Sequence, residues 1–191
     1  LPRWIAWSPM LDPERKARFK AAMSELAQLQ AKFDEQVLDA THAWSHLVQD
    51  AGQLAGVNAG IVAQAAQRAQ QQGIEGWVFG LDQPSYVAVM SDAQSPELRR
   101  VFYEAWCTRA SDQGPAAGRF DNTAVMADIL RLRHELARLL DFPSYAEYAL
   151  ADRMAHSVPE VSAFLRQLAA AARGSAVAEL AELEAYAGRP L

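Results

Sequence analysis

Long runs of apolar residues at helical spacing are the feature that most constrains the fold. Between Pro13 and about Ala40, apolar side chains recur every three or four positions, at Phe19, Met23, Leu26, Leu29, Phe33, Val37 and Leu38. The stretch from Thr123 to Leu140 repeats this pattern with Val125, Ile129, Leu132, Leu136, Leu139 and Leu140. Because such spacing places side chains on one face of an α-helix, each stretch predicts a long amphipathic helix.

Start signals mark these and further helices. Asp12-Pro13 and Ser95-Pro96 each pair an N-cap residue with a proline at the first helical position. Ser144-x-x-Glu147 and Ser157-x-x-Glu160 are capping boxes, the second opening a last helix. The apolar stripe of that last helix is Val161, Phe164, Leu168, Ala172, Val177, Leu180, Leu183 and Tyr186. Shorter helices are expected over residues 57–72, 85–92 and 96–108.

Two short segments are better suited to strands. Gly76 to Leu81 is aromatic and β-branched between glycines, and Trp44 to Gln49 is a weaker candidate. If they pair, they form a small patch that must lie against the helices, because an isolated pair of strands is marginally stable. The sequence therefore predicts a mainly α fold, a multi-helix array with at most a two-stranded β patch.

The stretch from Arg109 to Asn122 separates two helical patterns and is dense in Gly, Pro, Asp, Asn and Ser. These residues supply turns and caps. A polar loop of this length is either a structural crossover or a site loop. Asp112, Asp121 and Asn122 could serve as acid–base groups or cation ligands, but the loop lacks the alternating oxygens and terminal Glu of calcium loops. We expect Asp121 or Asn122 to cap the next helix, and Asp112 to pair with Arg109 or Arg119.

Bulk charge excludes some partners. The formal net charge is −5, and Lys and Arg form no run, which argues against nucleic-acid binding. No apolar run approaches the roughly 20 residues that span a bilayer, and no signal peptide is recognisable, so no membrane partner is expected. A single cysteine, which cannot form an internal disulfide, agrees with a cytoplasmic protein. Cys107 is the single cysteine and is expected to be a small buried residue beside Trp106.

His134-Glu135 begins like a zinc-peptidase motif, which requires a second His four residues after the first. The residue at that position is Arg138, so the second histidine of the motif is missing. The other histidines are His42, His46 and His156, and none lies at helical spacing from His134. No metal site is expected within this chain.

Other catalytic patterns are also missing. No serine lies in a G-x-S-x-G elbow, and no glycine-rich phosphate loop occurs. Tyr86, Tyr145 and Tyr148 could line a peptide groove, although aromatic residues at helical spacing more often pack in a core. We therefore predict no catalytic, cofactor-binding or metal-binding residue in this chain.

A series of short motifs, in chain order, resembles a known family. The motifs are Val37-Leu38-Asp39-Ala40-Thr41, Leu81-Asp82-Gln83-Pro84-Ser85-Tyr86, Thr108-Arg109-Ala110-Ser111-Asp112-Gln113-Gly114, Asp121-Asn122-Thr123, Ile129-Leu130-x-Leu132-Arg133-His134-Glu135-Leu136-Ala137 and Ser144-Tyr145-Ala146-Glu147-Tyr148. From about residue 12 to 186 they look like the thimet-oligopeptidase family, and within it the bacterial oligopeptidase A branch. The resemblance covers only part of the family's N-terminal half.

The resemblance implies a segment of the N-terminal lobe of a neurolysin-like zinc metallopeptidase that cuts short peptides inside a channel. Such a segment supplies channel wall and scaffold, while zinc and its His-Glu-x-x-His motif belong to a C-terminal catalytic lobe. Residues 1–191 would be one incomplete helical region, with residues 1–11 as an arm of uncertain placement and 12–187 as the family-like part.

Two interpretations remain open. The chain is either a fragment of such a peptidase, as its start at Leu1 without an initiator Met suggests, or a natural truncated homologue acting as a non-catalytic helical module that binds peptides or proteins. In both cases the chain alone is expected to lack peptidase activity. It is also expected to self-associate through the stripe of the last helix.

Overall fold

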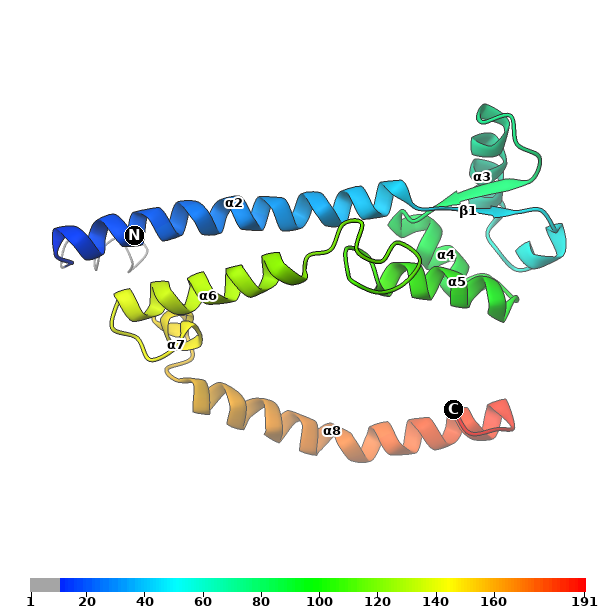
Figure 1. Ribbon diagram of the computed structural model, residues 1–191. Helices are drawn as coiled ribbons and strands as arrows, with labels where there is room; N and C mark the ends of the chain where they lie inside the picture. The colour runs from blue at the N-terminus through cyan, green and yellow to red at the C-terminus, as the bar shows by residue number, and fades with distance from the viewer. Residues whose placement is uncertain (1–10) are drawn as a thin grey trace. The chain divides into compact units, whose positions relative to one another are not determined.

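The computed structural model describes residues 11–191 and shows a mainly helical protein with one small sheet (Figure 1). The elements in chain order are α2 (Pro13–Ala43), β1 (Ser45–Val48), a 3₁₀ helix η2 (Ala51–Leu54), α3 (Ala59–Gln71), β2 (Trp77–Gly80), α4 (Gln83–Asp92), α5 (Pro96–Cys107), α6 (Thr123–Leu139), α7 (Tyr145–Leu150) and α8 (Val158–Ala187). This confirms the predicted fold class. The predicted arm, residues 1–11, lies outside the described residues except for Leu11.

The chain divides into two compact units. One holds Ser24–Leu132, and the other holds the residues through Met23 together with Arg133–Leu191. Helices α2 and α6 each contribute residues to both units. Each unit is described separately below.

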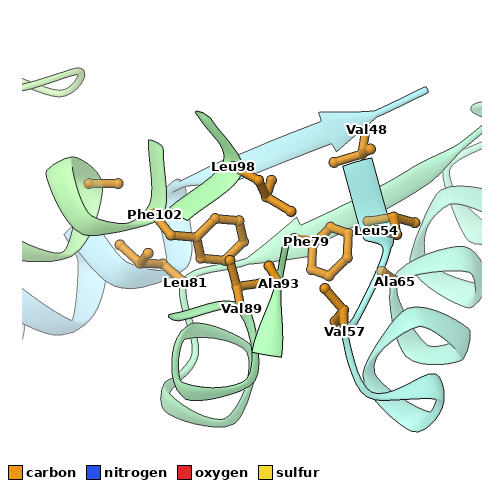
Figure 2. Close-up of a cluster of buried hydrophobic side chains, with 11 residues drawn as sticks. Val48, Leu54, Val57, Ala65, Phe79, Leu81, Val89, Ala93, Leu98 and Phe102 are labelled. Atoms are coloured by element: carbon orange, nitrogen blue, oxygen red, sulfur yellow. The ribbon is translucent and has the colours of Figure 1, made fainter. Parts of the chain in front are cut away.

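The Ser24–Leu132 unit has its main core where the strand pair meets α3, α4 and α5. Strands β1 and β2 pair antiparallel, with His46 opposite Phe79 and Val48 opposite Trp77, so the pairing that the sequence left open does form. The cluster consists of Val48, Leu54, Val57, Ala65, Phe79, Leu81, Val89, Ala93, Leu98, Phe102 and Ala105 (Figure 2). At its centre the rings of Phe79 and Phe102 meet edge to face, with centroids 5.8 Å apart. This contact joins the sheet to α5.

The predicted helix starts are confirmed by their capping hydrogen bonds. The Asp12 carboxylate accepts a hydrogen bond from the backbone N–H of Arg15 at 2.8 Å. The Ser95 hydroxyl accepts from Leu98 N–H at 3.2 Å, and Ser157 does the same for Glu160 at 3.2 Å. Because the first N–H groups of a helix have no partner within it, these side chains define where α2, α5 and α8 begin.

In the other unit, the first turns of α2 lie beside the end of α6. Arg15 donates to the backbone carbonyl of Leu139 at 2.6 Å and to Asp141 Oδ1 at 2.9 Å. Arg18 forms a two-pronged ion pair with Glu135. Phe19, Ala22, Leu136, Ala137 and Leu140 are buried in this unit. The apolar stripes predicted for the two helices therefore pack at this end.

Helix α8 has no buried residue, although it is 30 residues long and carries the predicted apolar stripe. Val158 and Val161, at its start, are half-buried. The large apolar side chains that follow are exposed, namely Phe164, Leu165, Leu168, Val177, Leu180, Leu183 and Tyr186. Among residues 11–191, no helix combines the length and apolar character that crossing a membrane requires.

Candidate functional site

The polar stretch between α5 and α6 is a compact closed loop. The backbone N–H of Asn122 donates to the Ala110 carbonyl at 2.9 Å, and the backbone N–H of Gly118 donates to the Ser111 carbonyl at 3.1 Å. Gly114 has a φ of +78°, and a Cβ there would lie 1.9 Å from Thr108 Oγ1. Only glycine combines this backbone conformation with so close an approach. The loop is thus shaped by its own backbone contacts.

Three side-chain hydrogen bonds attach this loop to α2. Asn122 Nδ2 donates to the Phe33 carbonyl at 3.1 Å, and Gln36 Nε2 donates to the Asp121 carbonyl at 3.3 Å. At the other end of the loop, Arg109 Nη1 donates to Thr41 Oγ1 at 3.2 Å. Asn122 is 2% exposed. These contacts support the crossover interpretation of the loop.

The carboxylate of Asp121 has structural partners. Asp121 Oδ1 accepts from the backbone N–H of Thr123 at 2.8 Å and from its hydroxyl at 2.6 Å. These hydrogen bonds lower the pKa of Asp121. Asp121 therefore caps the start of α6, as one of the two predicted candidates, whereas the side chain of Asn122 bonds back to α2. A carboxylate with a lowered pKa is a poor general acid near neutral pH.

The predicted pairing of Asp112 with Arg109 or Arg119 is wrong. The guanidinium of Arg109 stacks on Trp106, with Cζ 3.6 Å from the ring centroid, and that of Arg119 lies 4.9 Å from the ring of Phe120. Asp112 is exposed. Both arginines gain contact with an aromatic face, which sequence spacing alone did not indicate.

The four histidines are divided between the two units. His134 and Arg138 are both exposed on α6, and His156 is exposed before α8. His42 lies in the last turn of α2, whereas His46 lies on β1 beside Trp44 and Phe102, where burial lowers its pKa. Across residues 11–191, no three His, Cys, Asp or Glu side chains are grouped so as to hold a metal ion.

Cys107 is exposed, so the prediction of a buried thiol is wrong. Its neighbour Trp106 turns inward and stacks on Tyr86, with ring centroids 4.3 Å apart. Successive helical residues point about 100° apart, so Cys107 faces outward beside Tyr103, one turn earlier. A hydrogen bond with Cys107 raises the pKa of Tyr103.

The three tyrosines considered as groove residues are half-buried and pack on other aromatic side chains. Tyr86 stacks on Trp106, and Tyr148 contacts both Tyr145 and Phe142, with centroids 5.7 and 5.5 Å apart. Burial raises the pKa of Tyr148. Aromatic packing accounts for their positions.

Two cavities of similar volume lie in the Ser24–Leu132 unit. One, of about 400 Å³, is bordered by the ion pair between Arg68 and Asp82, whose atoms are 2.9 Å apart. The other, of about 390 Å³, is bordered by Trp106 and Arg109. Sequence reasoning missed this second cavity because its lining residues come from three separate stretches of the chain, 33–41, 81–83 and 106–109.

The described residues define a mainly helical protein with one small two-stranded sheet. A model of peptidase family M3 matches residues 89–190. The chain belongs to peptidase family M3.

Curated relatives agree with this family. The chain is 44% identical over 177 residues to oligopeptidase A of Escherichia coli, and 41% identical over 176 residues to that of Haemophilus influenzae. These matches cover 93% and 92% of this chain but 26% of each relative. A probable cytosolic oligopeptidase A of Arabidopsis thaliana is 35% identical, again over 93% of this chain and 25% of the relative. The chain thus spans about a quarter of the length of the relatives it matches, and the predicted resemblance is confirmed.

Proposed function

We propose that this chain is a non-catalytic segment of the N-terminal lobe of an oligopeptidase A-like zinc metalloendopeptidase. The complete protein would cut short peptides inside an enclosed channel in the cytoplasm, and this segment would supply wall and scaffold. The zinc ion and its His-Glu-x-x-His motif would belong to the C-terminal catalytic lobe. Membership of family M3 and the extent of the match to oligopeptidase A support this proposal.

The exposed face of α8 is the observation that carries the proposal. Phe164, Leu168 and Leu183 are 58%, 51% and 56% exposed, and further large apolar residues continue the same stripe. An apolar surface of this extent is typical of a docking interface. Since the relatives are about four times longer than this chain, the remainder of the peptidase is the occupant that we propose for this face.

Substitutions on this face test the proposal. We expect Phe164→Ser with Leu168→Ser to change the free energy of unfolding of the monomeric 191-residue chain, measured at high dilution, by less than about 0.5 kcal/mol, because both side chains are exposed in the monomer. In the full-length native protein the same pair should cost about 2 kcal/mol or more, because each side chain would be buried there. Gln167→Ser, at an exposed polar position of α8, is the control. Equal effects in both proteins would refute docking of α8 on the remaining lobe.

Metal content tests the assignment of zinc to the other lobe. We expect the purified 191-residue chain to bind no stoichiometric zinc and to cleave no peptide. One equivalent of zinc in this chain, lost on substitution of His134, would contradict the proposal.

A second candidate function is a naturally short homologue that binds peptides or proteins without cleaving them. The same exposed face of α8 favours it, because the face would then be open to another chain. The length of the native protein separates the two candidates.

A further inference from the structure

A cavity of about 390 Å³ lies between the second half of α2, the start of α4 and the end of α5. Its walls are mainly apolar and include Phe33, Val37, Leu38, Leu81 and Trp106. This volume falls within the range of roughly 300–1,000 Å³ that is usual for small-ligand sites. The polar groups on its wall determine which class of ligand it can bind.

Arg109 is the cation on this wall, and its guanidinium is held firmly. Nε donates to the Trp106 carbonyl at 3.0 Å, and Nη1 donates to Thr41 Oγ1 at 3.2 Å. The guanidinium lies flat on the Trp106 ring, which in turn stacks on Tyr86. A planar fork fixed in this way loses little freedom when it binds an anion.

The positive charge of Arg109 has no carboxylate partner within residues 11–191. Both of its hydrogen bonds end on neutral oxygens, a carbonyl and a hydroxyl. Burial lowers the pKa of Arg109, so the site penalises an uncompensated cation. Hydrogen bonds between a guanidinium and a carboxylate are about twice as strong as neutral ones. An incoming carboxylate is therefore the group that complements this wall.

The other polar groups fit a peptide end. Gln83, the first residue of α4, also borders the cavity, and its side-chain amide can donate a hydrogen bond to a carboxylate. Asp34, on α2, is the acidic residue that lines the cavity. Its carboxylate can accept a hydrogen bond from a peptide N–H group.

We propose that this cavity binds the C-terminal end of a short peptide, with the free α-carboxylate on Arg109 and an apolar C-terminal side chain against Trp106 and Leu81. The choice of a peptide rests on the proposed function, whereas the choice of a carboxylate rests on the cavity itself. The bound peptide end is held and not cleaved there.

Titration of the 191-residue chain with N-acetyl-Ala-Leu tests this assignment, followed by NMR shifts of the tryptophan indole N–H groups. We expect saturable binding in the range of about 0.1–1 mM. N-acetyl-Ala-Leu-amide, which lacks the carboxylate, should bind at least about tenfold more weakly. Acetate, which lacks the apolar body, should also bind at least about tenfold more weakly.

Two variants locate the site. Arg109→Met should weaken binding of the acid about tenfold or more, whereas Arg100→Met, at an exposed position on α5, should not. Gln83→Glu adds a negative charge to the cavity at a helix start, where acids are tolerated, so it remains informative if Arg109→Met fails to fold. It should weaken binding of the acid but not of the amide.

Several outcomes would overturn the assignment. These are no binding at about 10 mM peptide, equal binding of acid and amide, or unchanged binding in Gln83→Glu. In those cases Arg109 only ties the loop to α2. Because the test uses this chain alone, its failure leaves the docking role of α8 untouched, and failure of that docking leaves this result standing.

Discussion

At the scale of single residues, Gly114 is the tightest point of the loop after α5. A Cβ at this position would lie 1.9 Å from Thr108 Oγ1 and 2.6 Å from its Cβ, and φ is +78°. We expect Gly114→Ala to lower the free energy of unfolding by about 2–4 kcal/mol, because strain at positive φ adds to the steric overlap. Urea unfolding followed by circular dichroism measures this change.

Gly118 provides the matched control, since its φ is +76° but no atom lies within 4 Å of an added Cβ. Gly118→Ala should therefore cost only the conformational strain, about 1 kcal/mol. Equal costs at the two glycines would show that close approach to Thr108 does not shape the loop.

Asp82 caps α4 through Ser85 N–H and pairs with Arg68. Burial alone would raise the pKa of Asp82, but the hydrogen bonds from Ser85 and Arg68 outweigh it, so the net shift is downward. A lowered pKa means that the ionised form stabilises the fold above the ordinary aspartate value of about 4, and that this stabilisation is lost as the pH falls through the lowered pKa.

We therefore expect Asp82→Asn, which keeps the cap, to lower the free energy of unfolding by about 0.5 kcal/mol at pH 7, since the partly exposed pair is screened. The difference from the parent chain should shrink as the pH falls below about 4. Asp92→Asn, at the C-terminal end of α4, should be neutral or slightly stabilising. A pH-independent difference at Asp82 would contradict this account.

Residue-level contacts were the part that the sequence predicted least well. The caps Asp121 and Ser157 could be predicted, because a cap contacts residues only two or three positions away in the chain. The orientation of Cys107 and the partner of Arg109 depend on Trp106, whose inward position is fixed by Tyr86, twenty residues earlier. Contacts of that kind are set by packing between helices, which apolar spacing within one helix does not specify.

At the scale of elements, α5 is joined to the sheet through Phe102. Its ring is fully buried and meets the rings of Trp44 and Phe79, with centroids 5.1 and 5.8 Å away. We expect Phe102→Ala to lower the free energy of unfolding by about 3–5 kcal/mol, because it leaves a cavity in the core. Tyr103→Ala, at the neighbouring position that is 56% exposed, should change it by less than about 0.5 kcal/mol. Similar effects at both positions would contradict the assigned face of α5.

The existence and order of the α-helices and of both strands were predictable because each has a local signal, whereas the short 3₁₀ helix η2 was not predicted. The long helices show apolar spacing, their starts show caps, and β2 lies between glycines. Helix α2 continues to Ala43, about three residues beyond the predicted end, because the apolar pattern used for the prediction stops before the helical backbone stops. The cavity beside Arg109 had no local signal, since its lining residues come from three separate stretches of the chain.

At the scale of the whole molecule, the exposed stripe of α8 predicts self-association of the isolated chain. Apolar side chains on this helix would gain from burial against a second copy. Sedimentation velocity should show a concentration-dependent increase in mass, which Leu180→Ser with Leu183→Ser should abolish. A monomer at all concentrations would contradict this prediction.

The central claim is that this chain is one segment of a longer peptidase whose catalytic lobe lies elsewhere. Its most direct test is the intact mass of the native protein in its source cell, measured by top-down mass spectrometry. Since the matched relatives are about four times longer than this chain, whose mass is 21.0 kDa, we predict a species several times heavier. A native species near 21.0 kDa would contradict the claim and favour a short binding module.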